Sequence, residues 1–154
     1  MMKWIDDKEE KKRIASDILY DLPEWFGLPD STREYIECAR EYPFYAALQE
    51  NKPVGFLVLK KTGNATLELY VMGVRKEYQH QGIGKQLVQK GIHYAREHGF
   101  SFLQVKTVKM GHDPEYDATN AFYQKMGFQE LECFPELWDA HNPCQIYIQS
   151  IEKQ

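Results

Sequence analysis

A turn that contains two glycines is the segment of this chain best suited to bind a ligand. It reads Gln79-His80-Gln81-Gly82-Ile83-Gly84-Lys85 and lies between an apolar run that ends at Val74 and a helical pattern that begins at Ile83. Glycines let the backbone bend and let a ligand approach closely, and the first N–H groups of a helix have no acceptor within it. Such a helix start favours an anion. The turn therefore predicts a site for a phosphate or pyrophosphate group.

The glycine spacing separates this turn from two common nucleotide sites. No third glycine follows Gly84 in the GxGxxG register of a dinucleotide fold, and the GxxxxGK[ST] of a P-loop is absent. A plainer interpretation is that Gly82 starts a turn and Gly84 allows close helix packing. The nearby cations Arg75, Lys76 and Lys85 either add positive charge beside a phosphate or form a solvated surface run.

The composition is typical of a soluble globular protein, with 43% hydrophobic and 27% charged residues in 154. The length predicts one domain, residues 1–154. The formal net charge of -4 disfavours nucleic acid and anionic lipid as partners. No apolar run approaches the roughly 20 residues of a membrane span, and the start, MMKWIDDKEE, lacks the apolar core of a signal peptide. We therefore expect a cytoplasmic protein with no membrane partner.

The cysteines and histidines show no metal-site spacing. Cys38, Cys133 and Cys144 are far apart in the sequence, and none of the five histidines clusters with them. We expect reduced cysteines that act as small, partly buried side chains, and no bound metal.

The rest of the chain supplies elements that would position the turn. Apolar spacing predicts two N-terminal helices, the second capped by Asp30 or Ser31, joined by an aromatic loop at 22–27. Further patterns predict six strands and two more helices. The helices are expected at 8–20, about 31–40, 83–98 and 116–126, and the strands at 42–49, 53–61, 65–74, 101–108, 128–134 and 144–151. A helix separates 65–74 from 101–108, so a crossover is expected to bring these two strands together in one α/β sheet.

Two motifs resemble those of the GCN5-related N-acetyltransferase (GNAT) family. The run VRKEYQHQGIGKQL matches the signature [Q/R]xxGx[G/A], with Gln79, Gly82 and Gly84 at its defined positions. The run YDATNAFYQKMGF at 116–128 resembles the family's second motif, a helix that ends in FYxxxGF. Together they span 65–134. The resemblance implies a GNAT-like acyl-coenzyme A fold, a mixed sheet of about seven strands with four helices.

The resemblance also implies acetyl-coenzyme A as co-substrate. Its pyrophosphate would lie on the backbone N–H groups of Gln81–Lys85, beside Gln79 and His80. The strand at Met72–Val74 would diverge from 102–108 and leave a slot for the pantetheine arm, with Gly73 at a bulge. Tyr116 stands where many members have an Asn, and Asn120, four residues later, is the remaining coenzyme contact on that helix. These expected contacts are Met72, Gly73, Val74, Gln79, His80, Gln81, Gly82, Ile83, Gly84, Lys85, Asn120 and Tyr123.

Acyl transfer to an amine needs a base, a donor for the carbonyl oxygen and an acid for the leaving thiolate. By resemblance, Tyr123 would be the general acid, and a backbone N–H near Met72 or Gly73 would meet the oxyanion. Glu68 matches the general base of several members. Its apolar surroundings would desolvate the carboxylate and raise its pKa, and by strand alternation it would share a face with Met72. The alternatives are a tyrosine packed in the core and a solvated glutamate.

By resemblance, the acceptor pocket would be built by the N-terminal helices and the loop before the last strands. Trp25, Phe26, Trp138 and Asp139 are candidates, because aromatic faces and a carboxylate suit a cationic amine. Trp25 and Phe26 equally fit a hydrophobic clasp. We expect an N-acetyltransferase that acts by direct attack of a small-molecule primary amine. The alternatives are a protein or peptide amine acetyltransferase and a non-catalytic coenzyme A-binding module. The oligomeric state is open, and an exposed last strand at 145–150 could pair with a second subunit to form a homodimer.

Overall fold

The computed structural model describes residues 1–139 and 141–152. In this part of the chain seven strands form a mixed sheet with the order β1-β2-β3-β4-β5-β7-β6. The same residues also form four α-helices. The helices are α1 (Lys8–Leu19), α2 (Pro29–Ala39), α3 (Ile83–Glu97) and α4 (Pro114–Lys125). The strands are β1 (Met2–Trp4), β2 (Phe44–Gln49), β3 (Lys52–Lys61), β4 (Thr66–Val74), β5 (Phe102–Val108), β6 (Gln129–Asp139) and β7 (Asn142–Ser150). The predicted α/β fold class is confirmed.

Contacts divide the chain into two compact units, which are described separately. Unit 1 contains Met1–Lys60 and Leu69–His93, and unit 2 contains Lys61–Glu68 and Tyr94–Gln154. Strand β4 and helix α3 therefore each begin in one unit and end in the other.

The N-terminal helices of unit 1 begin in different ways. Asp7 caps α1, because its carboxylate accepts a bond from the Glu10 N–H at 2.8 Å. Helix α2 begins earlier than the predicted Asp30 or Ser31 cap: Leu28 is its N-cap, without a side-chain bond, and Pro29 occupies its first turn. Proline is suited to that position because its fixed φ is helical and its missing N–H is not needed there.

The sheet of unit 1 contains one strand that the sequence did not predict. Met2–Trp4 pairs with β2 in antiparallel register, so that Trp4 lies opposite Tyr45. Three residues are too few for a recognisable alternation. Strands β2 and β3 form a hairpin whose turn places Glu50 and Asn51 at positive φ, as a tight hairpin turn requires.

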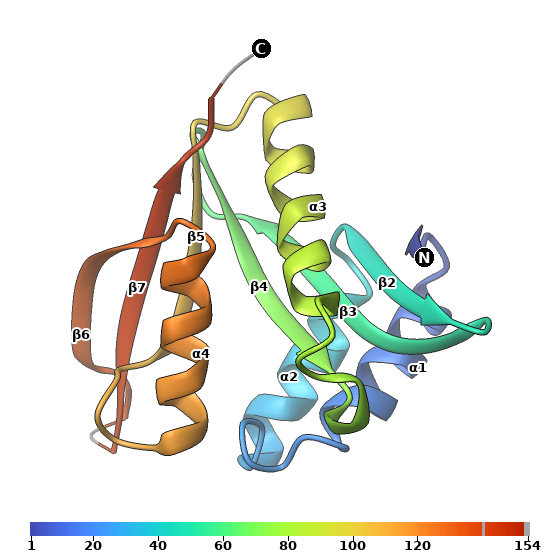
Figure 1. The fold of residues 1–154 in the computed structure, drawn as a ribbon, viewed down its shortest axis with the longest axis horizontal. Helices are drawn as coiled ribbons and strands as arrows, with labels where there is room; N and C mark the ends of the chain where they lie inside the picture. The colour runs from blue at the N-terminus through green and yellow to red at the C-terminus, as the bar shows by residue number, and fades with distance from the viewer. Residues whose placement is uncertain (140, 153–154) are drawn as a thin grey trace. The chain divides into compact units, whose positions relative to one another are not determined.

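Helices cover both faces of the unit 1 sheet (Figure 1). Phe56 and Val58 of β3 belong to a buried cluster with Ile18 of α1. Helix α3 lies against the other face, where a Cβ atom at Gly91 would meet Leu69 Cδ2 at 2.8 Å. The same face of α3 buries Leu87, Val88 and Ala95, as its apolar spacing predicts.

Strand β4 breaks the usual alternation of side chains. Leu69 faces α3, since it is the nearest neighbour of Gly91, whereas Tyr70 and Val71 both pack with the cluster under α1 and α2. Two successive residues on one face indicate a β-bulge at Tyr70-Val71. The predicted bulge at Gly73 is therefore two to three residues too far along the chain, and Glu68 and Met72 do not share a face.

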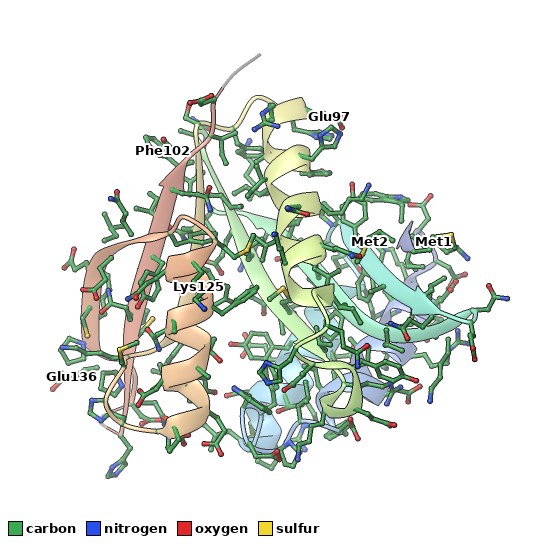
Figure 2. The ribbon with its side chains drawn as sticks, in the orientation of Figure 1. Met1, Met2, Glu97, Phe102, Lys125 and Glu136 are labelled. Atoms are coloured by element: carbon green, nitrogen blue, oxygen red, sulfur yellow. The ribbon has the colours of Figure 1, made fainter. Side chains whose placement is uncertain are left out.

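In unit 2, β7 lies between β5 and β6 and is antiparallel to both. The expectation of an exposed last strand that pairs with a second subunit is therefore wrong, because both edges of β7 are occupied. Strand β6 is the edge strand and extends to Asp139, beyond the predicted end at 134. Glu136 lies on this strand and is exposed (Figure 2).

Candidate active site

The glycine turn is shaped by bonds to the end of β4. After the short 3-10 turn Lys76–Tyr78, the Gln79 side chain donates to the Val74 carbonyl at 3.0 Å. His80 and Gly82 then adopt φ values of 64° and 85°. No atom lies within 4 Å of a Cβ built at Gly82, so its glycine is required by the backbone conformation and not by crowding.

The start of α3 presents main-chain donors. The first bond of the helix runs from the Gln86 N–H to the Gly82 carbonyl at 3.1 Å. The N–H groups of Ile83, Gly84 and Lys85 precede that bond and have no helical acceptor. Gln81, Gly82 and Lys85 are exposed. This turn can therefore offer several N–H groups and the positive end of a helix dipole to one anion.

The three cationic side chains near the turn differ in whether they are bonded to other residues. Arg75 donates from Nε to the Pro53 carbonyl at 3.2 Å, and Lys76 forms an ion pair with Glu24. Lys85 is exposed and has no bonded partner among the described residues. Lys85 is therefore the cation most available to a bound phosphate.

Gly73 has a packing role that the motif did not indicate. A Cβ atom there would lie 3.2 Å from Ile18 Cγ2 and from Leu22 Cδ1 and 3.3 Å from Phe56 Cε1. The glycine lets α1 and β3 pack closely against β4. The neighbouring Met72 and Val74 are half-buried and, by alternation, lie on the α3 face of the strand.

Glu68 lies in unit 2 and is buried, with 4% of its surface exposed. Its Oε1 accepts a hydrogen bond from Gln104 Nε2 at 2.8 Å and lies 3.2 Å from Lys106 Nζ. The alternative of a solvated, outward-facing glutamate is therefore excluded. The two β5 partners were not predicted, although the alternation of Gln104 and Lys106 with buried Leu103 and Val105 was a signal that the polar side chains share a face.

Tyr123 lies on α4 in an aromatic environment. It is 7% exposed, and its ring centroid lies 5.6 Å from that of Phe128 and 6.4 Å from that of Tyr147. Burial, with a smaller contribution from Tyr116, raises the pKa of Tyr123 well above its usual range. The phenol is therefore protonated at neutral pH, as a general acid must be.

Asn120 is fully buried and bonded within the protein. Its Nδ2 donates to the carbonyls of Val108 and Tyr116 at 2.9 and 2.6 Å, and its Oδ1 accepts from the Tyr147 hydroxyl at 2.6 Å. Gln124 Nε2 also donates to that hydroxyl at 3.2 Å. One bond attaches α4 to β5 through Val108, and the other stays within α4 at Tyr116, so Asn120 has no donor left for a coenzyme.

Glu68 and Tyr123 lie on opposite faces of the unit 2 sheet. Tyr147 reaches Asn120 of α4, and its strand partner Val105 therefore also faces that helix. Gln104 and Lys106, on either side of Val105, point to the other face, where they contact Glu68. A base on one face and an acid on the other suit a reaction whose nucleophile and leaving group occupy opposite sides.

The predicted acceptor residues of unit 1 are partly buried. Trp25 and Phe26 pack against the cluster under α1 and α2, which supports their role as a hydrophobic clasp. The ring centroids of Phe26 and Tyr35 lie 6.0 Å apart, and those of Tyr35 and Tyr70 lie 5.2 Å apart, both pairs in edge-to-face geometry. The sequence did not indicate this chain of aromatic rings, because its members come from a loop, a helix and a strand.

The predicted acceptor residues of unit 2 lie at the β6–β7 turn. Trp138 is 40% exposed. Asp139 accepts bonds from the His141 N–H at 2.8 Å and from Asn142 Nδ2 at 3.0 Å. The Asn142 bond and the His141 N–H hold the pKa of the Asp139 carboxyl below its usual range. Asp139 thus closes the turn, and its carboxylate is already bonded within it.

Two other kinds of feature are absent from the described residues. Residues 1–139 and 141–152 contain no group of three His, Cys, Asp or Glu side chains placed to hold a metal ion. Within the same ranges no helix has the length and hydropathy to cross a membrane.

Known proteins resemble this chain in sequence. The family model of the Acetyltransferase (GNAT) family matches residues 12–128. Mycothiol acetyltransferase of Corynebacterium glutamicum is 34% identical over 79 residues, which cover 51% of this chain and 25% of that protein. Human N-acetyltransferase 8 is 30% identical over 110 residues, with coverages of 67% and 45%. The N-acetyltransferase YvbK of Bacillus subtilis, itself uncharacterised, is 30% identical over 116 residues, with coverages of 75% and 70%. The chain thus spans less than half of the first two relatives.

Solved structures share the fold at low sequence identity. An acetyltransferase of the GNAT family from Desulfovibrio desulfuricans superposes with a TM-score of 0.84 at 19% identity, covering 99% of both chains. The ribosomal-protein-S18-alanine N-acetyltransferase of Escherichia coli gives 0.77 at 18% identity, covering 100% of this chain and 96% of that one. An aminoglycoside 6'-N-acetyltransferase in complex with coenzyme A gives 0.75 at 17% identity, with coverages of 100% and 98%.

Proposed function

Because this chain belongs to the acetyltransferase (GNAT) family, we propose that it transfers an acetyl group from acetyl-coenzyme A to the primary amine of a small molecule. The amine attacks the thioester directly while both substrates are bound. One observation carries the proposal beyond coenzyme binding: Glu68, a buried carboxylate, and Tyr123, a buried and protonated phenol, lie on opposite faces of the unit 2 sheet. Direct attack requires a proton acceptor and a proton donor in that arrangement.

The coenzyme half of the site is the start of α3. The pyrophosphate would be held by the main-chain N–H groups of Gln81–Lys85, with the Lys85 ammonium beside it. Gly82 at φ 85° gives the turn the backbone conformation that directs these groups outward. Gln79 and His80 shape the turn. Asn120 has no part in this binding, because its amide hydrogens are bonded inside unit 2.

The catalytic half joins residues of β4 and α4. Glu68 takes a proton from the attacking amine, and Tyr123 gives one to the departing thiolate. The bulge at Tyr70-Val71 leaves one residue of β4 out of the regular pairing, so a main-chain N–H near Met72 is a suitable donor to the carbonyl oxygen as it becomes negative. The Met72–Val74 end of β4 is the expected contact for the pantetheine arm.

A protein or peptide amine is the second candidate acceptor. This candidate is retained because the Escherichia coli enzyme named for ribosomal protein S18 has the same fold. The aminoglycoside enzyme, which also has this fold, supports a small-molecule acceptor in the same way. The aromatic residues Trp25, Phe26 and Trp138 suit either kind of cationic amine. A module that binds coenzyme A without transfer is the remaining alternative.

Thiol release distinguishes these candidates. Purified protein is incubated with acetyl-coenzyme A and, separately, with polyamines, aminoglycosides, amino acids and lysine- or alanine-ended peptides. Free coenzyme A is measured with a thiol reagent, and mass spectrometry identifies the acetylated product. We expect amine-dependent release with at least one small molecule, and no release from the Glu68→Gln variant above the uncatalysed rate. Release only with peptides would favour the second candidate, and coenzyme binding without release would favour the non-catalytic module.

A further inference from the structure

The two β5 side chains that contact Glu68 both bond the same carboxylate oxygen. Gln104 Nε2 donates to Oε1 at 2.8 Å, and Lys106 Nζ lies 3.2 Å from the same atom. Among the described residues, Oε2 has no bonded partner. Glu68 has an exposed side-chain fraction of only 5%, and Oε2 is not among the buried, unbonded polar atoms of the described residues, so this oxygen keeps a small exposed surface.

The surroundings of this carboxylate make Lys106 its specific cation. Lys106 forms no other ion pair in the described part of the chain, and its side chain is 32% exposed. The titratable thiol of Cys144 interacts electrostatically with both Lys106 and Glu68. Burial raises the pKa of the Cys144 thiol to about 11, so the thiol is neutral and does not compete for the ammonium. The positive charge of Lys106 is therefore directed at Glu68.

Strand β5 holds both partners in register. Gln104 lies opposite Ile148 and Lys106 opposite Ile146 in the antiparallel pairing with β7. Because alternate residues of a strand share a face, both side chains project to the side where Glu68 lies. Their positions are thus set by the sheet, which is more rigid than a loop.

We propose that Lys106 and Gln104 are positioning residues, which hold Glu68 through Oε1 and leave Oε2 as the atom that accepts the proton of the amine. This inference rests on the proposed acetyl transfer. In that reaction the amine nitrogen bonds to the thioester carbon and the carbon–sulfur bond breaks. The nitrogen's proton passes to Oε2, and the thiolate takes its proton from Tyr123. Lys106 and Gln104 stay in contact with Oε1 and hold the carboxylate in place during the transfer.

Substitutions at Lys106 test the role of its charge. Lys106→Met keeps the length of the side chain and removes the ammonium, whereas Lys106→Arg keeps a cation. We expect Lys106→Met to lower kcat by about ten- to a hundredfold, a part of what a general base contributes, with KM for acetyl-coenzyme A changed by less than about twofold. Lys106→Arg should restore kcat to within about fivefold of the wild type. Lys61→Met, at an exposed position, is the matched control and should leave kcat unchanged.

Gln104→Leu tests the neutral partner of Glu68 and serves as the second variant if Lys106→Met folds poorly. We expect it to lower kcat by about three- to tenfold and to leave the affinity for coenzyme A, measured by calorimetry, unchanged. The inference is overturned if the wild type and Lys106→Met have equal kcat while Glu68→Gln is impaired. It is also overturned if Lys106→Arg is as slow as Lys106→Met. A wild type that binds coenzyme A but acetylates no amine in the panel would instead contradict the proposed function, and the inference would fall with it.

Discussion

Tyr123 is the proposed proton donor and Glu68 the proposed proton acceptor, and the two side chains lie in different surroundings. Tyr123 must be protonated to act as an acid, and burial against Phe128 and Tyr147 keeps it so by raising its pKa. Glu68 must present an oxygen to the amine, and Gln104 and Lys106 hold its carboxylate through Oε1. The proposed acid and base are therefore held by different kinds of contact, aromatic packing for Tyr123 and polar bonds for Glu68.

The variant Tyr123→Phe removes only the hydroxyl of the proposed acid. We expect kcat to fall by about ten- to a hundredfold and the dissociation constant of coenzyme A to change by less than about twofold, since the ring packing is kept. Steady-state kinetics and titration calorimetry measure the two quantities. Phe122→Tyr, on the neighbouring helix position, is a control for altered α4 packing. An unchanged kcat in Tyr123→Phe would remove this residue from the mechanism.

The buried Cys144 thiol predicts a loss of stability in alkali. Its pKa is raised by burial from 9.0 to about 11. Between these two values the unfolded chain has released the thiol proton while the folded chain retains it, so the free energy of unfolding falls as pH rises. The loss from this group is about 2 kcal/mol across pH 9 to 11. Urea unfolding of wild type and Cys144→Ala at pH 8, 9, 10 and 11 should show a steeper decline in the wild type, and parallel declines would contradict this assignment.

Residue identities in the site were predictable only where a motif specifies them. Gln79, Gly82 and Tyr123 came from their spacing and from the resemblance. The sequence did not show that Asn120 and Asp139 have their polar atoms bonded within the protein, or that Gln104 and Lys106 meet Glu68. Such contacts join residues far apart in the chain, so local spacing carries no sign of them.

Helix α3 carries the glycine turn, and two glycines beneath and within it determine how closely it packs on the sheet. A Cβ atom at Gly55 of β3 would lie 3.3 Å from Ile83 Cγ2 and 3.4 Å from Leu87 Cδ1. A Cβ atom at Gly91 would lie 2.8 Å from Leu69 Cδ2 and 3.4 Å from Leu57 Cδ2. Larger side chains at these positions would lift the helix and move the N–H groups at its start.

Gly91→Val tests this close packing. Its branched side chain would overlap Leu69 and the β3 leucines, and we expect the free energy of unfolding to fall by about 1–3 kcal/mol. Gly63→Val is the matched control, because no atom lies within 4 Å of a Cβ at Gly63. The midpoints of urea unfolding report the difference. Equal midpoints for the two variants would show that α3 does not depend on the small residue at Gly91.

Gly84→Asp separates the binding role of the turn from its stability. A carboxylate in the first turn of α3 interacts favourably with the helix dipole, so the free energy of unfolding should stay equal or rise by a few tenths of a kcal/mol. The same charge would repel a pyrophosphate, and coenzyme A affinity should fall by about tenfold or more. Calorimetry with Gly63→Asp as control measures the affinity. If Gly84→Asp binds coenzyme A as the wild type does, the phosphates do not lie at this turn.

Elements with strong local patterns were predictable, and those defined by distant pairing were not. The buried stripe and terminal glycine of α3 indicated its bounds to within a residue. Strand β1 is too short to show alternation and exists because β2 offers a pairing edge. The sequence predicted a bulge at Gly73, because glycine is common at bulges, whereas the structure has it at Tyr70-Val71. Gly73 instead allows α1 to pack closely on the strand.

At the scale of the whole molecule, β6 is one of the two edge strands of the sheet at which copies of this chain could pair. Its pairing with β7 is irregular between Glu130 and Glu132 and again between Phe134 and Asp139. Pro135 lacks an N–H, and the strand carries several exposed glutamates. Bulges, proline and like charges are the features that keep exposed strands from pairing with one another. A homodimer, if it forms, is therefore expected to use another surface.

Removing these features should promote association. We expect the triple variant Glu130→Thr, Pro135→Val, Glu136→Thr to form larger species with rising concentration, while the wild type keeps one mass, because the variant edge offers continuous donors and loses its repulsion. Size-exclusion chromatography with light scattering measures both. Lys125→Thr, an exposed change on α4, is the control. A wild type that already associates through β6, shown by loss of the larger species in Glu132→Lys, would contradict this view.

The fold class was predictable for the whole chain because its α and β patterns alternate and two motifs occur in the order typical of one family. The division of the residues into two compact units was not, since it depends on which contacts are made between distant segments. The acceptor is likewise absent from the sequence pattern, because aromatic residues at Trp25, Phe26 and Trp138 suit many amines.

The proposed function depends most on the binding of the acetyl-coenzyme A pyrophosphate by main-chain N–H groups at the start of α3. Titration of ¹⁵N-labelled protein with coenzyme A, followed by amide NMR, observes those groups directly. We predict that the largest shifts occur at Gln81–Lys85 and saturate with a single dissociation constant, and that dephosphorylated pantetheine does not reproduce them. Saturable binding that leaves these five amide signals in place would show that the pyrophosphate does not lie at the start of α3.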